Sequence, residues 1–220
     1  MPLLFGRRTQ EAVEPETASE RTGTQKQVPA GTACVGLARA LGRVLREPKP
    51  EILNLGPLCG ESVVYLAGRG ARVTVEDFEP PSPIPPRQPG EIPVVPAPVV
   101  LDHSDGKFHL ILAWELLDFV PPERLLEFGR ELRRVTRDGG WLLLLSQAAM
   151  PSPREEPLSR YRLLADDLLV RETCEQPPRR RWVHPTREIE RALAGFSIQG
   201  IHLQRNQMRE IVAFKAGVGA

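Results

Sequence analysis

The chain has 220 residues, of which 41% are hydrophobic and 26% are charged, and its formal net charge is +1. This length and apolar content predict one globular domain with a sizeable core, and the small net charge excludes an electrostatic argument for a nucleic-acid or anionic-membrane partner. No segment approaches the ~20 apolar residues that span a bilayer, and the amino terminus lacks the pattern of a secretory signal. Three widely separated cysteines, which we interpret as free thiols, complete the prediction of a cytoplasmic protein.

Residues 1–30 are rich in Glu, Thr, Gln and Arg and contain few large apolar side chains. Such a segment buries too little surface to offset the entropy lost on ordering. We therefore expect a mobile tail, or alternatively a cap over a ligand site. The next segment, residues 32–46, places its apolar side chains on one helical stripe and is predicted to be a helix.

Residues 51–77 have the pattern of a strand, a glycine-containing turn, a helix and a second strand. The apolar runs 52–55 and 73–75 are the strands, residues 56–60 form the turn, and Glu76-Asp77 follow the second strand. This order is typical of a nucleotide-binding βαβ unit.

The chemistry of such a unit depends on its turn and its acid. A turn without side chains lets a ligand approach the backbone, the next helix presents unpaired N–H groups, and an acid such as Asp77 accepts hydrogen bonds from a ribose diol. Gly56 and Gly60 could instead only permit a tight turn, and Asp77 could be a solvated strand end. A nicotinamide dinucleotide would require glycine at Leu58 and Glu61 as well, so we rank that ligand lower.

Residues 79–98 are dominated by proline, which is incompatible with the interior of a helix. We expect a polyproline-like or irregular connection here. A third strand, if the chain forms one, would be a short edge piece at residues 92–95 or 98–101.

Two continuous apolar runs in the second half predict buried central strands, at residues 108–113 and 141–145. A helix that starts at Pro122 lies between them. Trp114 and Glu115 follow the first of these strands at its carboxyl end, where open α/β sheets bind ligands. Trp114 could stack on a ligand ring or cation or only cover the sheet edge.

Two further polar features of the second half of the chain, Asp118 and the basic run 179–182, each allow a functional and a structural interpretation. Asp118 could orient a nucleophile, although a solvated acid at a helix start is the preferred interpretation. The basic run 179–182 could contact an anionic substrate, although a solvated face is preferred there also.

Residues 151–185 are predicted to be a loop-rich insert that contains a helix at 161–171. Thr186 is predicted to cap a helix that runs through residue 194. Residues 197–203 and 210–215 then read as an antiparallel pair of strands. Alternating strands and helices that end in such a pair predict an α/β sheet with one reversed strand.

This order of elements resembles that of the class I S-adenosylmethionine-dependent methyltransferases over residues 31–216. The family's first motif is an acid followed by GxGxG; here Asn54 stands for the acid, Gly56 and Gly60 match the outer glycines, and Leu58 replaces the middle one. The acid that binds ribose in the family corresponds to Asp77. FHLILAWELLDFV and LRRVTRDGGWLLL are similar to the family's fourth-strand and fifth-strand segments.

The resemblance implies a three-layer Rossmann-like sandwich with a mostly parallel sheet of seven or six strands and one antiparallel strand near the carboxyl terminus. It implies S-adenosylmethionine as cofactor, no metal, and a small-molecule or protein methyl acceptor. The turn would hold the cofactor's amino-acid end, Asp77 its ribose, and Trp114 with Glu115 its methyl end. The implied cofactor-binding residues are Asn54, Gly56, Pro57, Leu58, Gly60, Glu76, Asp77, Phe78, Trp114 and Glu115.

Two departures from the family pattern motivate an alternative. Leu58 adds a side chain to the turn, and the family's adenine-contacting acid after the third strand is absent from the Pro96-Ala97-Pro98 region. The alternative is a catalytically inactive methyltransferase-like protein that serves as a partner or scaffold for another protein.

Overall fold

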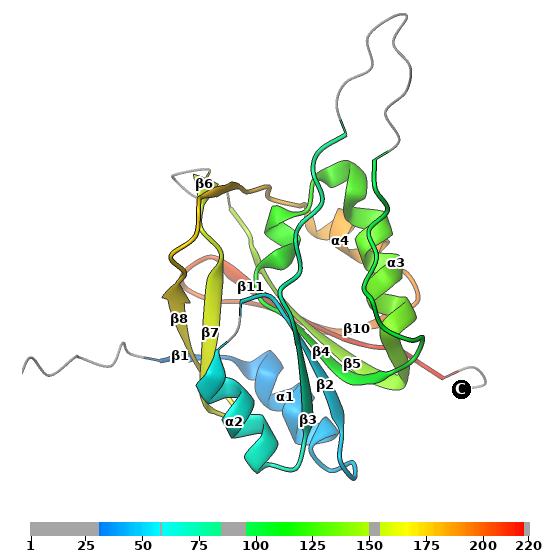
Figure 1. Cartoon of the computed structure of the whole chain (residues 1–220), viewed down its shortest axis with the longest axis vertical. Helices are drawn as coiled ribbons and strands as arrows, with labels where there is room; N and C mark the ends of the chain where they lie inside the picture. The colour runs from blue at the N-terminus through cyan, green and yellow to red at the C-terminus, as the bar shows by residue number, and fades with distance from the viewer. Residues whose placement is uncertain (1–30, 58, 85–95, 150–154, 218–220) are drawn as a thin grey trace, which may run out of the picture.

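The computed structural model describes residues 31–57, 59–84, 96–149 and 155–217. Its main sheet has six strands in the order β10-β11-β5-β4-β2-β3, and four helices pack on it (Figure 1). The strands are β2 (Glu51–Leu55), β3 (Arg72–Glu76), β4 (Phe108–Ala113), β5 (Thr136–Gln147), β10 (Ser197–Leu203) and β11 (Met208–Phe214). The helices are α1 (Val35–Val44), α2 (Gly60–Gly68), α3 (Leu125–Val135) and α4 (Thr186–Ala192), with 3-10 turns at Leu116–Phe119 and Pro122–Arg124.

The sheet is the middle of three layers, because its central strands are buried on both faces. Leu53 and Ile111 belong to a core cluster with α3 and α4, whereas Ile52 and Leu110 belong to a second cluster with α1 and α2. The alternation follows from the period of two in a strand. The predicted three-layer fold is confirmed.

The sheet has six strands and is parallel except for β11, which is antiparallel to both β5 and β10. The predicted carboxyl-terminal antiparallel pair is therefore confirmed.

The expected third strand at residues 98–101 is wrong, and the other candidate, 92–95, lies outside the described residues. The N–H of Val99 donates to Glu127 Oε1 over 2.7 Å, and the N–H of Leu101 donates to Glu131 Oε2 over 3.0 Å. Carboxylates of α3 thus supply the acceptors that a neighbouring strand would otherwise supply.

The expected helix at residues 161–171 is also wrong, because this segment is a β-hairpin. Strands β7 (Ser159–Ala165) and β8 (Leu168–Thr173) pair across a turn at Asp166-Asp167 and, with the short β1 (Thr32–Ala33), form a second sheet. Tyr161 and Leu163 are buried while their neighbours are more exposed, which is the period of a strand and not of a helix. A further short pair, β6 (Glu155–Glu156) and β9 (Arg179–Arg180), completes the insert.

Thr186 does not cap α4, because it is already the first helical residue and Pro185 precedes it. Its hydroxyl oxygen accepts a hydrogen bond from Arg209 Nη1 over 3.1 Å instead. Residues 1–30, expected to be a tail, lie outside the described part of the chain. Among the described helices, none is long and apolar enough to cross a membrane.

Candidate functional site

The carboxyl ends of β2, β3 and β4 meet at one edge of the sheet, since these strands are parallel neighbours. Leu55, at the end of β2, is in register with Glu76 on one side and with Ala113 on the other. The structure thus brings the predicted site residues of the three strands together at the edge where open α/β sheets bind ligands. Leu58 lies outside the described residues.

The turn after β2 requires glycine at one position. Gly56 has a φ of +114°, and its N–H donates to the carbonyl of Glu76 over 2.9 Å. This conformation is costly for residues with a Cβ, so the backbone alone explains Gly56. Gly60 begins α2, and a Cβ added there would meet nothing within 4 Å. Pro57 is buried beside the turn.

The indole of Trp114 is locked in place by contacts within the chain. Its Nε1 donates to Asn54 Oδ1 over 2.6 Å, and its ring stacks on Tyr161 with centroids 5.1 Å apart and planes at 20°. Trp114 is 1% exposed and Tyr161 is 5% exposed. Ser62 of α2 fixes the hairpin over this stack, because its hydroxyl donates to the carbonyl of Tyr161 over 2.9 Å and accepts from the N–H of Leu163 over 3.0 Å.

The carboxylate of Glu115 is surrounded by donors. Arg171 Nε and Nη2 donate to it over 2.6 and 3.1 Å, Arg181 Nη2 lies 2.9 Å away, and the hydroxyl of Tyr161 contacts it directly. Burial lowers the pKa of Arg171, but its hydrogen bonds to Glu115 outweigh this effect and raise the pKa above its usual value. Glu115 is 1% exposed and adopts a left-handed φ of 53°. Its charge is therefore neutralised by guanidinium groups of the chain itself.

Asp118 is buried and does not lie on a solvated helix start, so the preferred interpretation of this residue was wrong. Its carboxylate accepts from Ser146 Oγ over 2.7 Å, from the N–H of Gln147 over 2.9 Å and from Arg181 Nη2 over 2.7 Å. Burial raises its pKa to about 6, and the charge of Arg181 opposes that rise. The preferred solvated face is also wrong for Arg181, which is buried, whereas Arg179 pairs at the surface with Glu79 over 2.7 Å.

Two acidic residues, Glu76 and Asp77, lie at the carboxyl end of β3, and their surroundings differ. Glu76 Oε2 lies 2.9 Å from His103 Nε2, and burial raises the pKa of this glutamate. Asp77 is exposed, and Phe78 is buried against Phe128 with ring centroids 5.1 Å apart. Of these three residues Asp77 is the most exposed, Glu76 is partly exposed and Phe78 is buried.

Two pockets adjoin Asp77. One, of about 490 Å³, is lined by Pro57 and Arg160 and by residues 173–176 of the insert. The other, of about 580 Å³, is lined by residues 76–83 and 96–100. The nucleoside side of the predicted site therefore has open volume.

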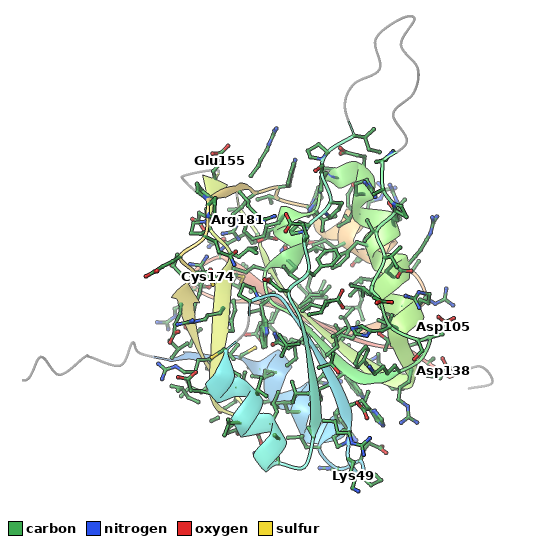
Figure 2. The ribbon with its side chains drawn as sticks, in the orientation of Figure 1. Lys49, Asp105, Asp138, Glu155, Cys174 and Arg181 are labelled. Atoms are coloured by element: carbon green, nitrogen blue, oxygen red, sulfur yellow. The ribbon has the colours of Figure 1, made fainter. Side chains whose placement is uncertain are left out.

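The insert supplies the site residues that sequence reasoning missed: Tyr161, Arg171 and Arg181, with Ser62 of α2 as their support. The signal that could have found the hairpin is the alternation of large apolar and charged residues around Tyr161. Nothing in the spacing indicates that Arg171 and Arg181 meet Glu115, because that contact depends on tertiary structure. Figure 2 labels Arg181 within the upper left of the molecule, where the insert meets the sheet edge.

Comparison with known proteins identifies structures of similar fold but no protein family and no relative by sequence. No family model matches the sequence, and no curated protein matches it. An S-adenosylmethionine-dependent methyltransferase structure from Mesorhizobium loti matches with 12% identity and a TM-score of 0.50, over 80% of this chain and 95% of that one. A structure described for the conversion of a disulfide bond into a thioacetal group during echinomycin biosynthesis matches with 17% identity and a TM-score of 0.50. The match covers 81% of this chain and 80% of that one.

The chain thus has the fold of the class I S-adenosylmethionine-dependent methyltransferases. The residues present differ in how well they suit the two halves of the cofactor implied by that fold. Asp77 is exposed beside open volume, as a ribose would require. Trp114, predicted to lie at the methyl end of the cofactor, is instead stacked on Tyr161, and Glu115 is already paired with Arg171 and Arg181. In this conformation neither of these two side chains is free to contact the methionine half of the cofactor.

Proposed function

We propose that this protein is a catalytically inactive member of the methyltransferase fold that acts as a binding partner or scaffold for another protein. The observation that carries the proposal is the position of the Trp114 ring. It stacks on Tyr161, and its Nε1 donates a hydrogen bond to Asn54. Trp114 is only 1% exposed and therefore presents no free ring face to a methyl donor. We expect the protein to act in the cytoplasm, with which its three free cysteines are compatible.

Opening this volume would carry a high free-energy cost. A buried aromatic side chain covers about 150–250 Å², so exposing both Trp114 and Tyr161 costs roughly 8–12 kcal/mol at ~25 cal/mol per Å². Withdrawal of the hairpin would also separate the buried carboxylate of Glu115 from Arg171 and from the hydroxyl of Tyr161, and leave Arg181 as its remaining partner. The binding free energy of a methyl donor would have to offset both the exposure of the two rings and the loss of this ion pair before any net affinity was measured.

Isothermal titration of the full chain with S-adenosylmethionine and S-adenosylhomocysteine tests the proposal. We expect no saturable heat at ligand concentrations up to about 1 mM, where the binding free energy is only about −4 kcal/mol. Saturable binding in the micromolar range would overturn the proposal.

A second candidate is an S-adenosylmethionine-dependent methyltransferase that acts on a small-molecule or protein acceptor. It is supported by the shared fold and by Asp77, which is exposed beside two pockets. This candidate requires the β7–β8 hairpin to withdraw from Trp114. If titration shows binding and Asp77→Asn weakens it about tenfold or more, as the loss of charge-assisted hydrogen bonds would, the second candidate is preferred.

A further inference from the structure

A third pocket, of about 580 Å³, lies at the opposite edge of the sheet, where the parallel strands begin. It is bounded by the carboxyl end of α1, by His109 near the start of β4 and by residues 137–139 at the start of β5. In Figure 2 Asp138, which lines this pocket, is labelled at the lower right of the molecule, and Arg181, which contacts Glu115, is labelled at the upper left. The volume is within the range of small-molecule sites.

The pocket carries a surplus of positive charge. Arg43, Arg46 and Arg137 line it, and within the described part of the chain no carboxylate lies within ion-pair distance of any of the three. Of the two acids that line it, Asp138 is already paired with Lys215 at 3.2 Å, and the other is Glu47. A helix carboxyl terminus favours a basic residue such as Arg43, but this effect does not explain Arg137, which lies on a strand.

The contact between His109 and Arg137 points to a missing acceptor. His109 Nδ1 accepts a hydrogen bond from the N–H of Glu51 over 3.1 Å, so the proton of the neutral ring lies on Nε2. That nitrogen directly faces Nη1 of Arg137, which is also a donor. An anionic oxygen that lies beside both groups in the pocket would accept a hydrogen bond from each of them.

The same pocket has an aromatic wall. Trp141 and Phe214 both line it, with ring centroids 5.2 Å apart and planes at 55°, and both rings are partly exposed. Partly exposed aromatic faces beside guanidinium groups are the surfaces on which nucleobases stack.

From these contacts we infer that the pocket binds a nucleoside polyphosphate. Its phosphate oxygens pair with Arg43, Arg46 and Arg137 and accept from His109, and its base lies against Trp141. The inference is independent of the proposed function, because it uses no residue of the carboxyl edge.

The test is titration of the full chain with ATP at low ionic strength without magnesium, with adenosine and inorganic tripolyphosphate as separate arms. We expect saturable binding of ATP, about tenfold weaker binding of tripolyphosphate, which lacks the base, and the weakest binding of adenosine. Arg137→Gln and the exposed Arg43→Gln should each weaken ATP binding about tenfold. Arg187→Gln, which removes an exposed arginine of α4 far from the pocket in sequence, is the matched control and should leave the affinity unchanged.

The ring of His109 provides a readout that does not depend on affinity. Burial and the charge of Arg137 lower its pKa, while Glu47 and Glu51 oppose this. A phosphate at Nε2 should raise the pKa, which is measured from the histidine proton resonances with and without ATP and assigned with His109→Gln. No binding of ATP at 1 mM, equal losses in Arg137→Gln and Arg187→Gln, or an unmoved His109 resonance would each overturn the inference. Equal affinity for tripolyphosphate and ATP would overturn the assignment of the base to Trp141.

Discussion

Trp114 Nε1 donates a hydrogen bond to Asn54 Oδ1 over 2.6 Å, and this bond joins the ends of two neighbouring parallel strands. The family resemblance assigns both residues to the binding of one ligand. In the structure they bind each other, and Tyr161 covers the pair. At these two positions, the carboxyl edge that binds a cofactor in open α/β sheets is here part of the protein's own core.

The bond between Trp114 and Asn54 should contribute measurably to stability. Trp114→Phe removes the donor and leaves a buried amide oxygen unpaired, which costs about 1–3 kcal/mol. We expect that decrease in the free energy of unfolding, measured by urea denaturation. Trp141→Phe, at a partly exposed position, is the control and should change it by less. Equal effects of the two substitutions would show that the buried bond has no special role.

Removal of the Tyr161 ring should open the volume above Trp114. Tyr161→Ala should cost about 3–5 kcal/mol, and S-adenosylmethionine should then raise the melting temperature of the variant more than that of the wild type. Phe128→Ala, which creates a cavity in the other core cluster, is the matched control. If the ligand shifts neither protein or shifts both variants equally, the ring is not what closes the site.

The ion pairs of Glu115 should be worth more than those at the surface. Glu115→Gln removes the carboxylate that Arg171 and the 1% exposed Arg181 share, although Arg181 keeps its pairs with Asp118 and Glu156, and breaking a buried pair costs about 3–5 kcal/mol. Glu79→Gln breaks the exposed pair with Arg179 and should cost less than about 1 kcal/mol. Urea denaturation of both variants measures the difference, and similar small losses would contradict the assigned network.

The sequence predicted most of the main sheet because its signals are local. The apolar run of β4 and the turn at Gly56 specify their conformations through burial and backbone geometry. The edge occupied by the predicted site was found for the same reason, since parallel strands place their carboxyl ends together. Binding of the cofactor by these residues remains a prediction.

What the sequence did not reveal depends on contacts between distant segments. The leucines of the hairpin at Tyr161 are compatible with a helix as well as with strands, so the local sequence does not distinguish the two structures. Its contact with Ser62 joins residues about a hundred positions apart, and no local pattern reports such a contact. Likewise, the loss of a third strand at Val99 depends on acceptors from Glu127 on α3.

The segment at Val99 and Leu101 should depend on the acids of α3. Glu131→Gln replaces a charged acceptor of the Leu101 N–H by a neutral one, and hydrogen bonds to charged groups are roughly twice as strong. We expect the Leu101 amide to exchange several times faster in native-state hydrogen exchange. The Val99 amide, held by Glu127, serves as the internal control and should change less. Unchanged exchange at Leu101 would mean that packing, not this bond, holds the segment.

Asp118 should make stability depend on pH. Its pKa is raised by burial to about 6 in the folded protein, above the ~3.9 of an unfolded chain. The folded state therefore binds the proton more tightly, and the stability contributed by this group is present below about pH 4 and lost as the pH rises through about 6. A difference of about two pKa units corresponds to roughly 3 kcal/mol.

Comparison with Asp118→Asn isolates this group from the other carboxyls. Between pH 4 and pH 7 the wild type should lose roughly 3 kcal/mol more free energy of unfolding than the variant, which cannot titrate at this position. Urea denaturation at both pH values measures the two losses. Parallel pH profiles would show that Arg181, 2.7 Å from the carboxylate, keeps the aspartate ionised throughout.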